Sequence, residues 1–365
     1  MTTSSSNSCN GITVNEITAD SFDNSKNSYD ICPFIESSWV ESFRCEYRKP
    51  VYFEFIKDNH PVGLASGIIV KSTFWLLEPA SKRIYLFGMP CTRGASLLEV
   101  VTALKGHLQA KGLNVATLFS YFNLEEPFLA GCGFQINTRK EFLVDLEQPV
   151  PQLWSNLSKN RKRIVNKCKK LELTITQSQD ISAVDRLMDC LRSTKDHRTE
   201  KGRGNYSYFV IPYMNEKILR KQLSLKIASV YLVHHQGEMV STCYLVRNAG
   251  YAYGLLWGST PKGYELGAQS FMLWKIIELM KEDHCRQLNL GGMPTGEGAD
   301  KIADFKLSLG SRIITCEGGK AALQTGLREQ IYKSYRILSE KSEPLKELLR
   351  CLKKTRGMKA KEEAS

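Results

Sequence analysis

The two halves of the sequence repeat one order of structural elements, and this repeat limits the folds open to the chain. In the first half, residues 50–57 and 62–70 are rich in Val, Ile, Phe and Tyr and flank the turn Asp-Asn-His-Pro, which predicts a β-hairpin. A strand, a helix closed by a glycine, and a second buried strand are expected next. These three elements are predicted at residues 84–87, 96–109 and 115–119.

The same order returns in the second half. Residues 225–234 and 239–246 flank the turn His-Gln-Gly-Glu and predict a second hairpin. A strand, a strongly periodic helix and a further strand follow, at residues 249–257, 268–281 and 286–290. We also expect a helix before each hairpin, with the helical segments at residues 34–46, 180–196 and 206–223.

Hairpins that alternate with strand–helix–strand units predict an α/β protein whose sheets are mixed and largely antiparallel, flanked by helices. A length of 365 residues favours two domains over a single core. We expect a loose leader at 1–30, a first domain at 31–148, and a second domain at 149–320 that carries the site. Residues 321–365 are expected to form a helical segment that ends in a basic tail.

The chain is basic, with 50 Lys and Arg against 38 Asp and Glu and a formal net charge of +12. This charge suggests an anionic partner such as CoA, a nucleotide-linked precursor or nucleic acid. The 11 cysteines include no Cys-x-x-Cys pair, which argues against a structural zinc and a disulfide framework. We see no signal peptide and no membrane span, and expect a cytoplasmic monomer that holds no metal.

Residues 288–312 bring a strand end, two glycines and a lysine close together in sequence. Leu288 and Leu290 indicate a buried strand, which runs into Gly291 and Gly292 where the backbone must turn or pack closely. A Gly-rich loop and a short helix with Phe305 and Lys306 follow, and Gly310 ends that helix. One interpretation is a functional site on a loop whose backbone conformation is energetically unfavourable. The other is a surface turn followed by a solvated lysine.

Residues 159–170 form a basic segment with seven Lys or Arg residues and no acidic residue. Apolar residues fall on one stripe of the expected helix and would dock it, namely Leu157, Ile164, Cys168 and Leu171. We interpret Arg161, Lys162 and Arg163 as contacts to a phosphate-bearing donor. The alternative is a solvated basic face.

The turn at residues 258–268 runs from a strand end into a helix N-terminus, where free N–H groups can bind an anion. Gly258, Gly267 and Ala268 are the small residues of this candidate donor site. A tight turn with a capped helix is the alternative. Tyr253 and Trp257 lie on the preceding strand and border the expected site.

Together these motifs resemble the FemABX-like transferases, which are tandem GNAT-fold proteins. The resemblance lies in Leu-Asn-Leu-Gly-Gly, a Gly-rich loop and Phe-Lys-x-x-x-Gly, and in Leu-Trp followed by a basic helix. It implies two GNAT-like domains, with a C-terminal segment that packs on the first. It also implies transfer of an acyl or aminoacyl group from acyl-CoA or aminoacyl-tRNA onto an amine, with Phe305 and Lys306 facing the donor. No resident cofactor is implied.

The sequence departs from the GNAT pattern at Tyr-Glu-Leu-Gly-Ala, where the leading basic or amide residue of the pyrophosphate loop is missing. The departure counts against acetyl-CoA, whereas the lack of a coiled-coil arm counts against the tRNA-dependent members. Candidates for a general base are Asp304, Glu265, Tyr253 and His234. The rival interpretation is a non-catalytic GNAT module that binds RNA or a nucleotide-linked ligand and does not need Lys306.

Overall fold

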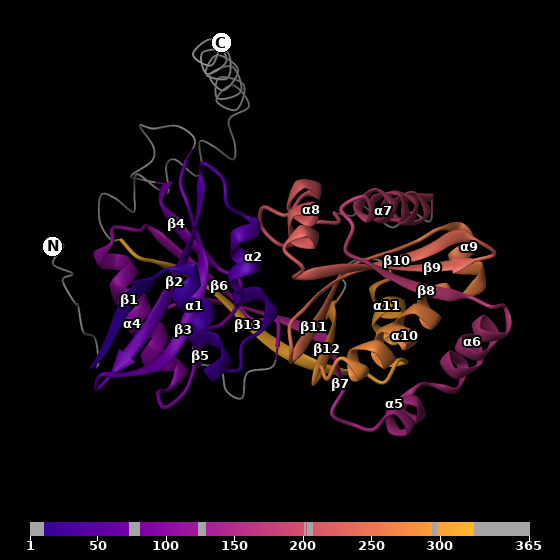
Figure 1. Cartoon of the computed structure of the whole chain (residues 1–365), viewed down its shortest axis with the longest axis horizontal. Helices are drawn as coiled ribbons and strands as arrows, with labels where there is room; N and C mark the ends of the chain where they lie inside the picture. Colours follow the sequence, from indigo (N-terminus) through magenta and orange to yellow (C-terminus); the bar gives the residue numbers. More distant parts are fainter. Residues whose placement is uncertain are drawn as a thin grey trace, which may run out of the picture.

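A computed structural model describes residues 11–72, 81–122, 129–200, 202, 207–293 and 298–324. These residues form two lobes that lie side by side (Figure 1). The elements of the first lobe, in chain order, are β1 (Ile12–Ile17), α1 (Ala19–Ser25), the 3₁₀ turns Lys26–Ser28 and Pro33–Ile35, α2 (Ser37–Ser42), β2 (Arg48–Lys57), β3 (His60–Val70), β4 (Arg83–Leu86), β5 (Cys91–Thr92), α4 (Leu97–Ala110) and β6 (Val115–Phe119).

The remaining elements begin with a long strand at the junction of the lobes and return to that junction at the end. They are β7 (Gln135–Asp145), α5 (Val150–Asn156), α6 (Lys159–Lys170), β8 (Thr174–Ser178), α7 (Ala183–Glu200), α8 (Glu216–Ser224), β9 (Ala228–His235), β10 (Glu238–Arg247), β11 (Tyr251–Ser259), α9 (Pro261–Leu266), α10 (Ala268–Glu282), β12 (Gln287–Gly292), α11 (Ala299–Leu307) and β13 (Arg312–Ala322).

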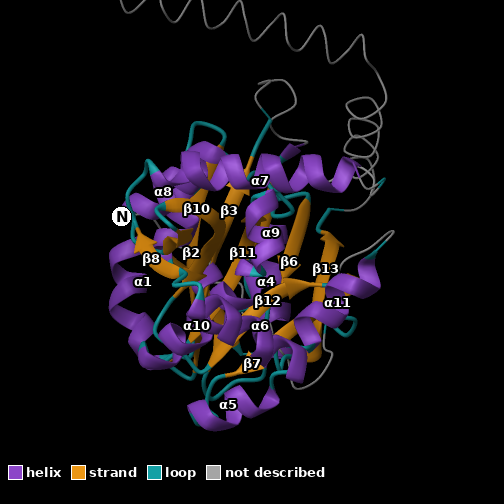
Figure 2. Cartoon of the chain, turned by 90° about the vertical axis from the view of Figure 1, so that its right-hand side faces the viewer, coloured by secondary structure: helices purple, strands orange, loops and turns teal. Residues whose placement is uncertain are grey.

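A single sheet of 13 described strands passes through both lobes, and its order is symmetric about its centre. The path is β1-β2-β3-β4-β6-β13-β7-β12-β11-β10-β9-β8, with β5 paired to β3. On each side an antiparallel hairpin leads to one parallel pair, β4 with β6 and β11 with β12. Helices surround these strands (Figure 2). The predicted repeat, and with it the α/β fold with a largely antiparallel mixed sheet, is confirmed.

The two lobes exchange strands at the centre of the sheet. β13 is the last described strand, yet it pairs with β6 of the first lobe from Gly318–Phe119 to Ala322–Val115. β7 comes before the second lobe in sequence, yet it pairs with β12 through Gln287–Asp145. β7 and β13 also pair with each other. Each lobe is therefore completed by a strand that the other half of the sequence supplies.

Local turn chemistry explains both hairpins. The two turn residues are Asp58 and Asn59 in the first hairpin, with φ of 50° and 62°, and Gln236 and Gly237 in the second, with φ of 50° and 81°. Two consecutive positive φ angles are typical of type I′ turns, whose twist matches that of the strands they join. The hairpin registers follow from these two-residue loops.

The long helix α4 begins and ends where its sequence predicts. The Ser96 hydroxyl accepts from the Glu99 N–H at 3.2 Å, and the Glu99 carboxylate accepts from the Ser96 N–H at 2.9 Å. This reciprocal pair is a capping box, which satisfies two of the free N–H groups at the helix start. Gly112, with φ of 72°, then takes the left-handed conformation that stops the helix.

Residues 11–30 do not form the loose leader that we expected. β1 extends the edge of the sheet, where Ile12 pairs with Lys57, and Phe22 of α1 is fully buried. The segment is polar in composition, so its few apolar residues did not form a pattern that predicts a buried strand or helix. The helix expected at 206–223 also differs, because α8 begins only at Glu216, after Asn215 caps it through the Ile218 N–H. Residues 1–10, and most of the expected helical segment at 321–365, lie outside the described residues.

An aromatic cluster joins the lobes. Phe34 is fully buried, and its ring centroid lies 4.1 Å from that of Tyr121 and 5.2 Å from that of Tyr253. Tyr121 and Tyr253 contact each other edge to face at 5.3 Å. Phe34 and Tyr121 come from the first lobe and Tyr253 from β11, so this cluster fixes the β11 end of the second lobe against the first.

We expect the Phe34→Ala variant to lose about 3–5 kcal/mol of unfolding free energy, because it leaves a cavity in this cluster. Removal of the α4 cap by Ser96→Ala should cost only about 1 kcal/mol. Urea unfolding followed by circular dichroism measures both variants. A loss for Phe34→Ala no greater than that for Ser96→Ala would contradict this role for the cluster.

Candidate functional site

Lys306 on α11 is held against the end of β12. Its ammonium donates to the carbonyl oxygens of Gly291 at 3.1 Å and Gly292 at 2.9 Å. The ammonium also lies 5.0 Å from the ring centroid of Phe142 on β7. The glycine pair and the lysine that the sequence placed on either side of a loop are thus in direct contact. Lys306 is not a freely solvated surface lysine.

A β-bulge in β12 aims these two carbonyl groups at Lys306. Asn289 pairs with Leu143 of β7 and Gly292 pairs with Glu141, so β12 has one extra residue in this interval. Gly291 has φ of 84°, which a residue with a side chain adopts only under strain. The Asn289 side-chain oxygen accepts from the Gly291 N–H at 2.7 Å and supports the bulge from within the strand.

Asn289 connects the bulge to an ion pair whose carboxylate is buried. Its amide nitrogen donates to the Tyr121 carbonyl and to the Glu141 carboxylate, and Asn289 is fully buried. Glu141 is 1% exposed and accepts from the Arg139 guanidinium at 2.6 Å. Arg139 also lies over the ring of Tyr121, with its guanidinium carbon 4.4 Å from the centroid.

Burial shifts the two charged groups of this site in opposite directions. It lowers the pKa of Lys306 from 10.5 to about 8, and the negative charge of Glu141 opposes this shift. It raises the pKa of Glu141, and hydrogen bonds from Arg139, Asn289 and Tyr253 oppose that rise. Desolvation disfavours the charged form of any ionisable group, which accounts for both directions.

Tyr253 and Trp257 lie beside this cluster on β11. Tyr253 is 5% exposed, and its hydroxyl lies 3.8 Å from the position that a Cβ atom at Gly291 would occupy. The Trp257 indole donates to the Gly254 carbonyl at 2.9 Å. β11 and β12 pair only as far as Tyr253 and Asn289, after which the two strands separate. Ligands commonly bind beyond the carboxyl ends of parallel strands in open α/β sheets.

Arg161 connects the basic helix α6 to this site. Its guanidinium carbon lies 4.5 Å from the Phe305 ring centroid, and its nitrogens donate to the hydroxyls of Ser308 at 2.8 Å and Ser270 at 3.1 Å. Burial lowers the pKa of Arg161. Within the described part of the chain, no carboxylate pairs with this guanidinium.

The other predicted basic contacts lie on the outer side of α6. Lys162 donates to the Ser155 carbonyl at 2.9 Å, and Arg163 is exposed and contacts Asn160. The helix itself is confirmed, and of the expected apolar stripe Leu157 and Cys168 are buried and Ile164 packs against the core. Leu171 is instead 37% exposed, and Val165 is buried in addition.

The small residues at 258–268 are in close packing. The Cβ position at Gly258 is 2.8 Å from the backbone of Cys190 on α7, and that at Gly267 is 2.6 Å from the side chain of Ile164 on α6. Ala268 is fully buried. α6 therefore packs against the break between α9 and α10, where we had placed an anion.

Of the four candidate bases, Tyr253 alone joins the Lys306 cluster. Asp304 and Glu265 are exposed, and Glu265 pairs with Lys262 at 3.7 Å. His234 is on β9, two strands from β11 in the sheet. Among the described residues, no group of three or more His, Cys, Asp or Glu could hold a metal ion. No described helix is long and apolar enough to cross a membrane.

Three members of the cluster were missed by sequence reasoning: Arg139, Glu141 and Asn289. Asn289 stands within the Leu-Asn-Leu-Gly-Gly motif, and a polar residue between two buried leucines was a usable signal. Arg139 and Glu141 lie on β7, which our sequence analysis did not describe. Because they are two residues apart in a strand, their side chains could have been placed on the same face of the sheet. The sequence does not show which residues that face contacts.

We expect the lowered pKa of Lys306 to appear in the pH dependence of stability. Between pH 8 and 10.5 the unfolded chain holds a proton on Lys306 that the folded chain has lost, so stability rises with pH in this window. The unfolding free energy of the protein minus that of Lys306→Met should increase there by at most about 3 kcal/mol.

Urea titrations at closely spaced pH values measure this difference. Lys301→Met, at an exposed position of the same helix, controls for the loss of one positive charge. A difference that is flat, or that falls, between pH 8 and 10.5 would contradict the buried ammonium.

Comparison with known proteins identifies a similar domain and a similar fold. Residues 155–306 match the family model described as an acetyltransferase (GNAT) domain. No curated protein matches the chain in sequence. Among solved structures, FemX aligns with a TM-score of 0.64 at 10% identity, over 83% of this chain and 96% of its own.

Two further structures align more weakly. A tandem GNAT protein from the clavulanic acid biosynthesis pathway has a TM-score of 0.48 at 10% identity, over 86% of this chain and 99% of its own. L-PGS from Bacillus licheniformis has a TM-score of 0.47 at 16% identity, over 76% and 86%. Scores this low decide nothing about this chain.

At 10% identity the FemX alignment establishes a shared fold, and it confirms at that level the resemblance stated above. The family match adds a likeness in sequence over residues 155–306, and it ends at Lys306 itself. Residues 155–306 therefore match an acetyltransferase (GNAT) domain, and the chain as a whole shares the fold of FemX.

Proposed function

We propose that the protein transfers an acyl group from an activated donor onto an amine, at the point where β11 and β12 separate. The ammonium of Lys306 is the observation that carries this proposal. It is largely buried, and it already binds two carbonyl oxygens within 3.1 Å. A desolvated ammonium stabilises negative charge on a carbonyl oxygen far better than a solvated one.

In the proposed reaction, a neutral amine attacks the carbonyl carbon of the donor. A C–N bond forms, and the carbonyl oxygen becomes an oxyanion that Lys306 stabilises. The bond from carbon to the leaving group then breaks, and the amine releases one proton. The leaving atom is sulfur if the donor is acyl-CoA and ribose oxygen if it is aminoacyl-tRNA. The leaving sulfur or oxygen takes up this proton, because burial raises the pKa of Tyr253 and keeps its phenol protonated.

We place acyl-CoA first among the donors, because the matched family is described as an acetyltransferase. The side chain of Ile164 on α6 packs closely on Gly267, at the turn where we had expected a donor phosphate. The exposed side of α6 offers another place. Lys159, Arg163, Lys167 and Lys170 form an exposed row there, and within the described structure none pairs with a carboxylate. Such a row also suits aminoacyl-tRNA, which stays the second donor.

Lys306→Ala should lower kcat for acyl transfer by about 10²–10³, the usual cost of removing one oxyanion donor. Lys301→Ala is the matched control and should keep full activity. Transfer is measured with acetyl-CoA, longer acyl-CoAs and aminoacyl-tRNA in turn, against a panel of amines. Equal activity of Lys306→Ala and the unmodified protein would remove Lys306 from the mechanism. Ligand binding without turnover in either would favour the non-catalytic module.

Charge reversal on α6 tests the donor surface separately. Arg163→Glu combined with Lys167→Glu should weaken binding of a polyanionic donor and reduce the slope of log K against log salt by about 2. Arg161 is left intact because it packs against Phe305 and two serines. The control carries Lys49→Glu and Lys217→Glu, two exposed lysines outside α6. Equal losses in both double variants would show a general charge effect.

A further inference from the structure

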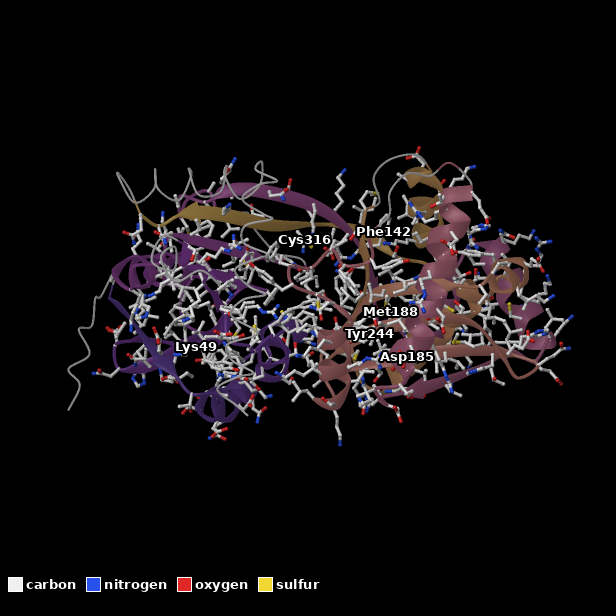
Figure 3. All side chains as sticks on the ribbon, turned by 90° about the horizontal axis from the view of Figure 1, so that it is seen from above. Lys49, Phe142, Asp185, Met188, Tyr244 and Cys316 are labelled. Atoms are coloured by element: carbon white, nitrogen blue, oxygen red, sulfur yellow. The ribbon has the colours of Figure 1, made fainter. Side chains whose placement is uncertain are left out.

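The Lys306 site depends on a residue that lies outside the matched GNAT domain. That domain begins at residue 155, whereas Glu141 is on β7, at the junction of the two lobes. Figure 3 shows this junction, with Phe142 of β7 and Cys316 of β13 in the middle of the molecule. Phe142 is next to Glu141 in sequence and lies under the Lys306 ammonium.

A continuous series of hydrogen bonds leads from Glu141 to Lys306. The Glu141 carboxylate accepts from the Asn289 amide, and the same Asn289 side chain accepts from the Gly291 N–H. The carbonyl oxygens of Gly291 and its neighbour then bind the ammonium. If Glu141 were absent, the buried Asn289 amide would lose an acceptor, and the bulge would lose the group that anchors it.

Charge provides a second connection. The Glu141 carboxylate acts on Lys306 directly through its negative charge, as well as through the bulge. Other ionisable groups face Glu141 from the neighbouring elements, namely Arg139 on β7, Tyr253 on β11, Tyr121 after β6 and Cys316 on β13. Among these neighbours, Arg139 is the cation that pairs with the carboxylate.

We propose that Glu141 is a positioning residue of the Lys306 site: it holds the β12 bulge through Asn289 and so places the two carbonyl groups that seat the ammonium. The effect of Glu141 on kcat rests on the proposed acyl transfer. The effect of Glu141 on the titration of Lys306 does not depend on that proposed function. A carboxylate from the first half of the sequence thus controls a site in the second half.

Glu141→Gln keeps the size of the side chain and an acceptor for Asn289, and removes the charge. The titration of Lys306 is followed by competitive labelling with acetic anhydride at a series of pH values, read by mass spectrometry. The midpoint should fall by about one unit, because the carboxylate no longer favours the charged amine. The control is Glu317→Gln, at a buried glutamate of β13 that accepts from the Leu129 N–H, and it should leave the midpoint unchanged.

Kinetics supply the second readout. Glu141→Asp keeps the charge but is too short to reach Asn289 in the same way, so kcat should fall about tenfold while KM stays within twofold. In a Lys306→Ala background the same change should have no further effect, because both act on one step. A general loss of fold would instead lower the activity of both backgrounds.

A folded Glu141→Asp protein with labelling and kcat equal to those of the unmodified protein would overturn the proposal, because this variant changes the contact with Asn289. An unshifted Lys306 midpoint in a folded Glu141→Gln protein would contradict the direct effect of the charge, since Gln still offers Asn289 an acceptor. If no donor supports transfer, the proposed function fails while the labelling midpoint still tests Glu141. The two failures are therefore distinguishable.

Discussion

The antiparallel pairing of β7 with β13 is the interaction on which the rest of the structure depends. It joins the two lobes into one sheet and leaves neither with an open edge at the centre. Unpaired strand edges inside a protein would expose N–H and C=O groups that no other element satisfies. Because each of the two strands also pairs with a lobe formed from the other half of the sequence, neither lobe has a complete sheet by itself.

Strand β7 of this pair also contributes to the buried surroundings of Lys306. A positive charge in an apolar setting is costly unless nearby groups compensate it. Here the compensation comes from two carbonyl oxygens of β12, from the face of Phe142 and from the charge of Glu141. Two of these contributors lie on β7. The strand that completes the sheet of the second lobe therefore also sets the electrostatics of its site.

Sequence reasoning succeeded where local chemistry determines the structure. The two hairpins, the helix α4, the periodic helix α10 and the basic helix α6 all depend on residues close together in sequence. It failed where the determining contact is distant. β13 was not expected as a strand because its partners, β6 and β7, lie far away in sequence. Glu141 was missed because no residue near it in sequence indicates a contact with Asn289. The motif around Lys306 was found because its loop is short.

The strand exchange has a consequence for how the chain folds during its synthesis. β6 pairs with residues 318–322, about two hundred positions further along the chain. The first lobe therefore leaves the ribosome with a bare edge at β6, and that edge stays open until the whole second lobe has been made. Such an edge is a hazard for association with other chains. The hairpins of the first lobe can form early, but its sheet is finished by almost the last described residues to emerge.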